Sequence, residues 1–105
     1  MTSLAFEQRG DRRLEVVFGV AVEAGGDPQI GRIIEISQAG ARLLLTTSLA
    51  VGQEVVLRRG GVELRGKVTW ERGHNVGIGF SAPLDEPNFL RLRRSGFEQR
   101  ANDLT

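Results

Sequence analysis

Apolar and polar residues alternate with a period of two through most of this chain, and this pattern constrains the fold more than any other feature. The clearest case is the segment VELRGKVTWE, residues 62–71, where every second residue from Val62 to Trp70 is apolar or glycine. These residues are expected to face a core, and the polar residues between them are expected to face water. The segment is therefore predicted to be a half-buried strand with one face exposed to solvent.

Further segments have the same strand-like pattern or composition, at residues 14–24, 31–37, 41–47, 54–59 and 76–81. Turn-forming stretches separate them, at residues 25–31, 38–40, 49–53, 60–61 and 72–75. The pair Gly60-Gly61 is the strongest of these signals, because both positions tolerate the positive φ of a two-residue hairpin. Six short strands at a spacing of about ten residues predict an all-β fold, either an antiparallel barrel or a sandwich.

The segment DEPNFLRLRRSG differs from the rest of the chain and is expected to form a short C-terminal helix at residues 86–95. Asp85 or Glu86 lies near the predicted N-terminus, with Pro87 in the first turn and arginines towards the end. Phe89 and Leu92 are three residues apart, so they are expected to lie on one face of this helix. That face is predicted to close an open end of the barrel.

The chain has 105 residues, a length typical of one domain. We therefore expect a single domain made of a flexible, arginine-bearing arm at residues 1–13, a barrel at 14–82, the helix and a tail at 97–105. The N-terminal sequence lacks the apolar region of a signal peptide, and no run approaches the ~20 apolar residues of a membrane span. The protein is expected to be cytoplasmic, without membrane insertion.

Residue types that serve catalysis or metal binding are scarce. The chain has no cysteine, which excludes disulfides, thiolate metal sites and a cysteine nucleophile. Its only histidine, His74, lies in a predicted turn, where histidine is most often a solvated polar residue. No phosphate-binding loop, nucleophile elbow or dinucleotide fingerprint is present. The sequence predicts neither an enzyme nor a metal site, and no cofactor is expected.

The net charge of +1 is too small for a global electrostatic field to attract nucleic acid. A nucleic-acid-binding small barrel is also disfavoured because no series of exposed aromatic residues lies along a predicted strand face. The basic residues are unusual, with 13 arginines against a single lysine, Lys67. Two explanations stay open: codon bias of the genome, or a specific need for guanidinium groups that bind phosphate and base edges.

Two polar motifs lie close to the predicted strands. RGDRR places Arg9, Arg12 and Arg13 just before the first strand. EISQAG places Glu35, Ser37 and Gly40 between two apolar runs. Glu35 and Ser37 are two residues apart and are expected to face outward together. Gly40 is expected to provide either a positive φ or a close approach between backbones.

With these motifs the chain resembles the PilZ domain family, small six-stranded bacterial barrels of which many bind the second messenger cyclic di-GMP. The family has an RxxxR motif before its first strand, matched here by Arg9 and Arg13, and a [D/N]xSxxG motif, matched by Ser37 and Gly40. The stretches VGQEVVL, GKVTW and NVGIGF are similar to its fourth, fifth and sixth strands. The resemblance covers residues 9–82 and implies a six-stranded antiparallel barrel.

The resemblance implies a cyclic di-GMP receptor that signals to an unidentified partner protein, such as one of a motility or envelope system. Arg9 and Arg13 would bind phosphate and guanine, Arg12 would assist, and the EISQAG residues would line the platform. Two features depart from the family. Glu35 replaces the shorter Asp or Asn, and a register starting at Arg12 would place Val16 at the second arginine position. The alternative is a degenerate PilZ-like adaptor that binds a protein and no nucleotide.

Overall fold

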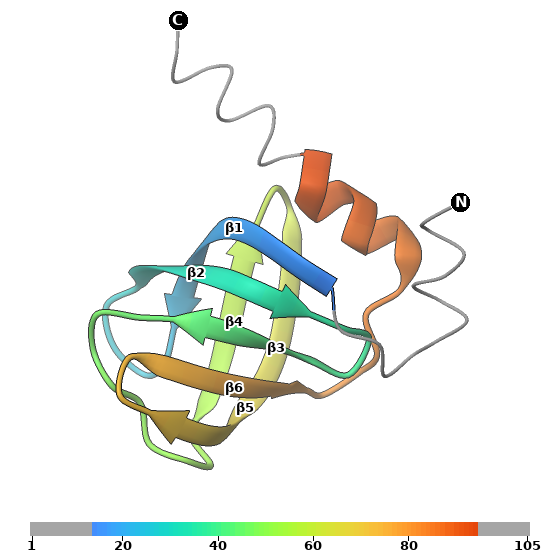
Figure 1. Ribbon diagram of the computed structural model, residues 1–105. Coiled ribbons are helices and arrows are strands. Elements are labelled where there is room, and N and C mark those ends of the chain that lie inside the picture. Colours follow the sequence, from blue (N-terminus) through green and yellow to red (C-terminus); the bar gives the residue numbers. More distant parts are fainter. Residues whose placement is uncertain (1–13, 95–105) are drawn as a thin grey trace, which may run out of the picture.

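The computed structural model describes residues 14–94, and the strands within this part close into an antiparallel barrel (Figure 1). The strands are β1 (Leu14–Glu23), β2 (Gln29–Ile36), β3 (Gly40–Leu44), β4 (Glu54–Arg59), β5 (Val62–Arg72) and β6 (Asn75–Phe80). Their order around the barrel is β1-β2-β3-β6-β5-β4, and β4 pairs with β1 to complete the circle. The predicted six-stranded antiparallel barrel is confirmed.

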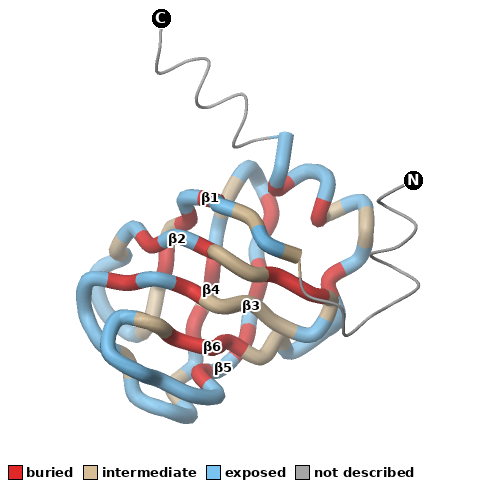
Figure 2. The backbone as a smooth tube through the Cα atoms, viewed as in Figure 1, coloured by how far each residue is buried: buried red, intermediate tan, exposed pale blue. Residues whose placement is uncertain are grey.

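The alternation seen in the sequence places one side of each strand in a common core. Buried and exposed stretches follow one another along the strands in Figure 2. On β1, for example, Phe18, Val20 and Val22 are buried, while Val17, directly before Phe18, is 65% exposed. Inward side chains from all six strands meet in a single apolar cluster, whose burial is the main stabilising contribution to the fold.

The turn at Gly60-Gly61 has the geometry that its sequence predicts. Gly60 and Gly61 have φ values of 59° and 81°, and Arg59 pairs directly with Val62 across the hairpin. Positive φ at both central residues matches the right-handed twist of the flanking strands, and glycine adopts it without steric cost.

The loop predicted at residues 25–31 is shorter than expected. Strand β2 already begins at Gln29, which pairs with Val22.

Trp70 does not point into the core, so this part of the alternation prediction was wrong. The pairing of β5 with β6 shifts between Val68, which is opposite Ile78, and Trp70, which is opposite Gly77. Thr69 is therefore an extra residue in β5, a β-bulge, and its hydroxyl donates a hydrogen bond of 3.2 Å to the Gly77 carbonyl. One extra residue reverses the inside and outside positions that follow it, which turns the indole to the outer surface.

The C-terminal helix is formed by residues 86–94 within the described part and covers one end of the barrel (Figure 1). The Asp85 carboxylate caps it by accepting a hydrogen bond of 2.9 Å from the Asn88 amide. Phe89 and Leu92 are 3% and 1% exposed, as predicted for a face that closes the barrel. The Phe89 ring lies 6.5 Å from the Phe18 ring, centroid to centroid.

Arg59 joins this helix to the barrel. Its Nε donates a 2.8 Å hydrogen bond to the Leu92 carbonyl, and its NH1 donates to the Gly19 carbonyl of β1. The guanidinium also lies 4.9 Å from the centroid of the Phe18 ring.

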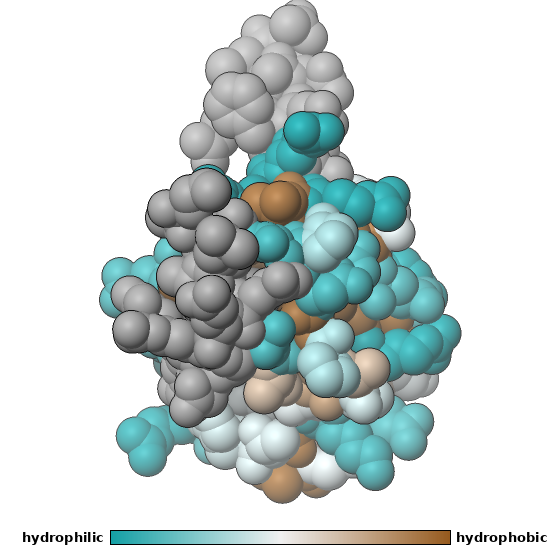
Figure 3. All heavy atoms as spheres, turned by 90° about the vertical axis from the view of Figure 1, so that its right-hand side faces the viewer, coloured by the Kyte–Doolittle hydropathy of each residue, from teal (hydrophilic) through white to brown (hydrophobic). Residues whose placement is uncertain are grey.

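Seen from the side that carries the helix, the described surface is mainly hydrophilic (Figure 3). Among residues 14–94, no helix is long and apolar enough to cross a membrane.

Candidate functional site

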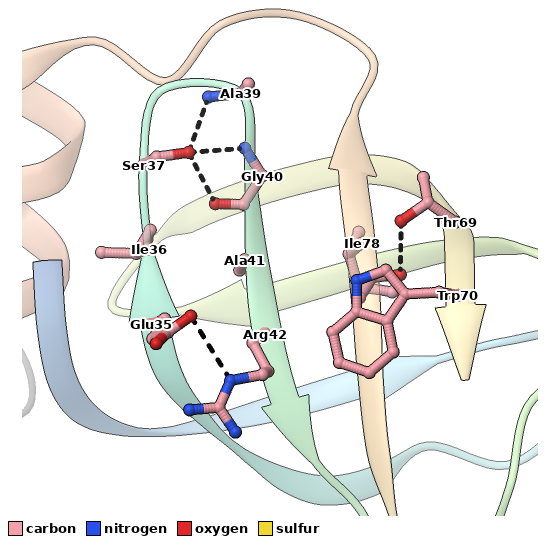
Figure 4. Close-up of a pocket in the computed structure, with 11 residues that line it drawn as sticks. Glu35, Ile36, Ser37, Ala39, Gly40, Ala41, Arg42, Thr69, Trp70 and Ile78 are labelled. Carbon is pink, nitrogen blue, oxygen red and sulfur yellow. Dashed lines mark hydrogen bonds and ion pairs between the residues drawn. The ribbon is translucent and has the colours of Figure 1, made fainter. Parts of the chain in front are cut away.

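The turn between β2 and β3 is organised by the Ser37 hydroxyl. Its Oγ accepts hydrogen bonds from the amides of Ala39 and Gly40, at 3.2 Å and 3.3 Å. Figure 4 shows the hydroxyl turned towards these two amides. The Ser37 amide donates to the Gly40 carbonyl at 2.8 Å, which closes the turn. Because the hydroxyl is used inside the turn, Ser37 is only 7% exposed. The expectation that Ser37 faces outward beside Glu35 was wrong, although Ser37 still contributes to the wall of the hollow next to it.

Gly40 allows two strands to approach closely. Its φ is not positive, so the requirement lies in space and not in backbone conformation. A Cβ at this position would overlap the carbonyl oxygen of Ile78 on β6, far inside van der Waals distance. Of the two explanations that the sequence offers for Gly40, the structure supports the close backbone approach.

Glu35 is held by Arg42 on the neighbouring strand. The two residues pair across β2 and β3, and Arg42 Nε lies 3.4 Å from Glu35 Oε1. Arg42 is fixed from the other side as well, because its NH1 donates a hydrogen bond of 3.0 Å to Asn75 Oδ1. Both side chains of the ion pair keep contact with water, at 23% exposure for Glu35 and 34% for Arg42. The guanidinium therefore has a defined position on the outer surface.

These residues belong to a row that crosses four strands. Glu35 on β2 is opposite Arg42 on β3, Arg42 is opposite Gly77 on β6, and Gly77 is opposite Trp70 on β5. A Cβ on Gly77 would overlap the Trp70 indole, so the missing side chain makes the space that the ring occupies. The row thus presents a carboxylate, a guanidinium and an aromatic ring on one outer face (Figure 4).

A hollow of about 170 Å³ opens between this row and the Ser37 turn. Three of the sequence-predicted site residues line it, namely Glu35, Ser37 and Gly40. Thr69, Trp70 and Arg42 also line it and were not predicted as site residues. Arg42 could have been found as the cross-strand neighbour of Glu35 in a tight hairpin. Trp70 could not, because the alternation pattern gives no sign of the bulge.

The other predicted site residues, Arg9, Arg12 and Arg13, lie outside the described part of the chain. Strand β1 begins at Leu14, which pairs with Ile36, so this strand starts beside the Ser37 turn.

The hollow beside that turn offers hydrogen-bond donors on Arg42, an acceptor on Glu35 and a stacking surface on Trp70. These groups suit it to bind a planar polar ligand. Within residues 14–94, no group of three or more histidine, aspartate or glutamate side chains is placed to hold a metal ion.

A comparison with protein-family models matches residues 7–98 to the PilZ domain. The chain belongs to the PilZ domain family. Domains of this family are binding and adaptor modules, generally for cyclic di-GMP, and both sequence motifs described above lie within the matched region. The predicted membership is therefore confirmed.

A solved structure supports the fold of this PilZ domain. The crystal structure of the PilZ domain of CeSA, from a cellulose-synthesizing bacterium, matches with a TM-score of 0.58 and 16% sequence identity. The match covers 86% of this chain and 99% of the CeSA chain. At this identity the likeness concerns the barrel architecture alone. No curated protein matches the sequence.

Proposed function

We propose that this PilZ domain is a receptor for cyclic di-GMP, which it binds on the outer face beside the Ser37 turn, and that it passes the signal to a partner protein. The observation that supports this most is the row of Glu35, Arg42 and Trp70 next to that turn. These residues provide a carboxylate acceptor, a guanidinium donor and an aromatic face within one hollow.

The chemistry of guanine fits this set of groups. Its N1 and N2 hydrogens need an acceptor, which Glu35 provides, and its O6 and N7 atoms need donors of the kind that Arg42 carries. The indole of Trp70 offers a surface on which a base stacks. Cyclic di-GMP has two guanines, and the hollow of about 170 Å³ is smaller than the roughly 300–1,000 Å³ of sites that enclose drug-sized ligands. We therefore expect one base to enter the hollow and the rest of the ligand to lie outside it.

Arg9 and Arg13 of the family motif would bind the part of the ligand that stays outside the hollow. Phosphate oxygens accept paired hydrogen bonds from a guanidinium group, and this contact is among the stronger ones available to a protein. Arg12 would assist from the same segment. In this arrangement the barrel supplies a rigid base-binding surface, and the arginine motif supplies the charge.

Titration calorimetry with cyclic di-GMP tests the proposal, with GMP as the control. We expect micromolar or tighter binding of cyclic di-GMP and much weaker binding of GMP, because one guanine and one phosphate use only part of the site. Trp70 is the only tryptophan in the chain, so ligand binding should also change the intrinsic fluorescence. Absence of heat and of a thermal shift at ~100 µM ligand would refute the receptor proposal, since binding stabilises the native state.

The second candidate is an adaptor that binds a protein partner and no nucleotide. It is favoured by Glu35, which is longer than the acid or amide of the family motif and is already paired with Arg42. If this pair is too stable to open for a guanine, the hollow has no free acceptor at the motif position. The same titration separates the two candidates, because the adaptor would fold normally and give no signal with cyclic di-GMP.

A further inference from the structure

A second hollow is lined by residues near the start of β2 and at the end of β3, whereas the Ser37 turn joins the other ends of these two strands. We refer to it as the distal hollow and define it by Ile30, Arg32, Leu44 and His74, which line it. Its volume is about 520 Å³, and it is open to solvent. The His74 carbonyl accepts a hydrogen bond of 2.9 Å from the Leu45 amide, so the β5–β6 turn is fixed against the end of β3.

The outer side chains of the distal hollow are more apolar than the barrel requires. Ile30 is 73% exposed and Leu44 is 40% exposed, and both are absent from the apolar core. An antiparallel sheet usually presents polar residues on its solvent face, so a polar residue would serve the fold equally well at either position. Two large aliphatic side chains exposed in one hollow indicate a surface that another molecule covers.

Arg32 lies between these apolar side chains, and no carboxylate of residues 14–94 forms an ion pair with it. It pairs directly with Leu44 across β2 and β3, two residues along the strand from Ile30. Among the described residues, Arg42, Arg58 and Arg65 each form an ion pair, whereas Arg32 forms none. A guanidinium with apolar neighbours gains most from a carboxylate that arrives together with an apolar group, because the pair is then shielded from water.

We propose that the distal hollow binds a partner protein through a segment in which an aspartate or glutamate lies next to a large aliphatic or aromatic side chain. The carboxylate pairs with Arg32, and the apolar side chain covers Ile30 and Leu44. A second copy of this chain is a poorer occupant, because two-fold pairing through this face sets Arg32 against Arg32. Nucleic acid is also a poorer occupant, because one guanidinium is not a basic patch.

The distal hollow and the Ser37 turn are far enough apart to be occupied together. Ser37 follows Ile30 by seven positions along the chain of β2, which at the rise of a β-strand corresponds to about 23 Å. The proposal therefore does not depend on nucleotide binding. If the receptor proposal is correct, the distal hollow is the surface that contacts the partner. If the adaptor proposal is correct, it has the same role without a nucleotide.

A selection of random peptides displayed on phage against the immobilised full chain tests the proposal. We expect enriched peptides to carry Asp or Glu within two residues of Leu, Ile, Phe or Trp. In a fluorescence anisotropy titration, Arg32→Glu should weaken their binding by at least about tenfold, as expected for a central interface residue. Replacing the peptide's acid by lysine should restore binding to the Arg32→Glu variant, because the charges are then exchanged.

Two serine substitutions provide a matched comparison. Leu44 and Leu90 have similar exposures of 40% and 43%, but Leu90 lies on the C-terminal helix, away from the distal hollow. We expect Leu44→Ser to weaken peptide binding and Leu90→Ser to leave it unchanged, with equal melting temperatures for both variants. Equal binding by parent, Arg32→Glu and Leu44→Ser would overturn the proposal, as would a selection that enriches no such peptide. Self-association of the parent that Leu44→Ser abolishes would overturn it in favour of a second copy.

Discussion

At the Ser37 turn, the Ser37 hydroxyl satisfies backbone amides, and the missing side chain of Gly40 allows two strands to approach closely. The hydroxyl satisfies the amides of Ala39 and Gly40, which would otherwise have to find partners in a tight turn. The missing side chain of Gly40 lets β3 lie against the Ile78 carbonyl of β6. Both residues of the family motif are therefore structural in the first place, and they prepare the surface on which a ligand would lie.

Replacing Gly40 by alanine should destabilise the protein, because the new Cβ would overlap the Ile78 carbonyl oxygen and push two backbones apart. We expect a loss of about 1–3 kcal/mol in the free energy of unfolding, the usual cost of overpacking a tight site. Chemical denaturation would measure it. Gly26 is the control, since its φ is not positive and a Cβ there meets nothing within 4 Å, so Gly26→Ala should not be destabilising. Equal stability of Gly40→Ala and the parent would contradict the argument.

The receptor and adaptor proposals predict different effects of substitutions at Glu35 on the binding of cyclic di-GMP. Glu35→Asp should preserve or strengthen binding of cyclic di-GMP, because the family motif has the shorter acid or amide at this position. Glu35→Ala should weaken binding by about tenfold or more, since a hydrogen bond to a charged group contributes about 1.5–3 kcal/mol. Calorimetry on both variants measures the effect, with Glu54→Ala as a control outside the hollow.

Two other outcomes of the calorimetry on the Glu35 variants would lead to different conclusions about this residue. If Glu35→Ala binds as well as the parent, the carboxylate serves only its ion pair with Arg42. If the parent does not bind and Glu35→Asp does, the chain is a receptor that has lost its function through one methylene group. Arg42 lies directly opposite this position on β3, and the two acids differ only in the distance of the carboxylate from the backbone, so the comparison isolates the length of the side chain.

At the scale of the elements, the C-terminal helix is part of the core and not an appendage. Its two buried side chains, Phe89 and Leu92, are as well buried as those of the strands, and Arg59 ties its last turn to β1. The sequence was sufficient to predict this helix, because the capping acid, the spacing of the two apolar residues and the late arginines agree. Its contact with Arg59 was not predictable, since it depends on the barrel bringing β4 next to β1.

Phe89→Ala should therefore destabilise the whole domain and not only the helix. We expect a loss of about 3–5 kcal/mol, the usual cost of truncating a buried phenylalanine, and a single unfolding transition by circular dichroism. Leu90→Ala on the same helix is the control, because Leu90 is 43% exposed and should change stability by less than about 0.5 kcal/mol. A helix that melts separately, with the barrel unaffected, would show that the two do not share one core.

In strand β5 the alternation of inward and outward residues breaks after Val68. Its first seven residues follow the alternation, and the bulge at Thr69 then reverses it, so Trp70 reaches the outer surface. Alternation alone cannot reveal an inserted residue, because Trp70 is apolar and fits an inward position equally well. The alternation was sufficient to predict the strands, and the family resemblance decided between a barrel and a sandwich. The positions of Trp70 and Gly77 in the candidate site depend on this bulge and on strand pairing across β3 and β6.

At the scale of the whole molecule, the hollow that contains the Glu35–Arg42 ion pair and the more apolar distal hollow lie at opposite ends of β2 and β3. Both hollows lie on strands that are paired with a neighbour on each side, so neither surface can act by adding a strand to a partner. Recognition must instead rely on outward side chains and on the termini. The net charge of +1 gives no long-range attraction, and any affinity for an anionic ligand has to come from specific contacts.

The arginines of the RxxxR motif provide the most direct test of that conclusion. Arg13→Ala should weaken binding of cyclic di-GMP by about tenfold or more, because a charge-assisted paired contact contributes about 1.5–3 kcal/mol. Arg100→Ala removes the same charge from the other end of the sequence, outside both motifs, and should leave the affinity unchanged. Both positions lie outside residues 14–94, whose side chains form the apolar core, so we expect both variants to unfold at the temperature of the parent. Equal losses of affinity for the two variants would mean that the ligand responds to total charge, and the RxxxR motif of this chain would then have no specific part in binding.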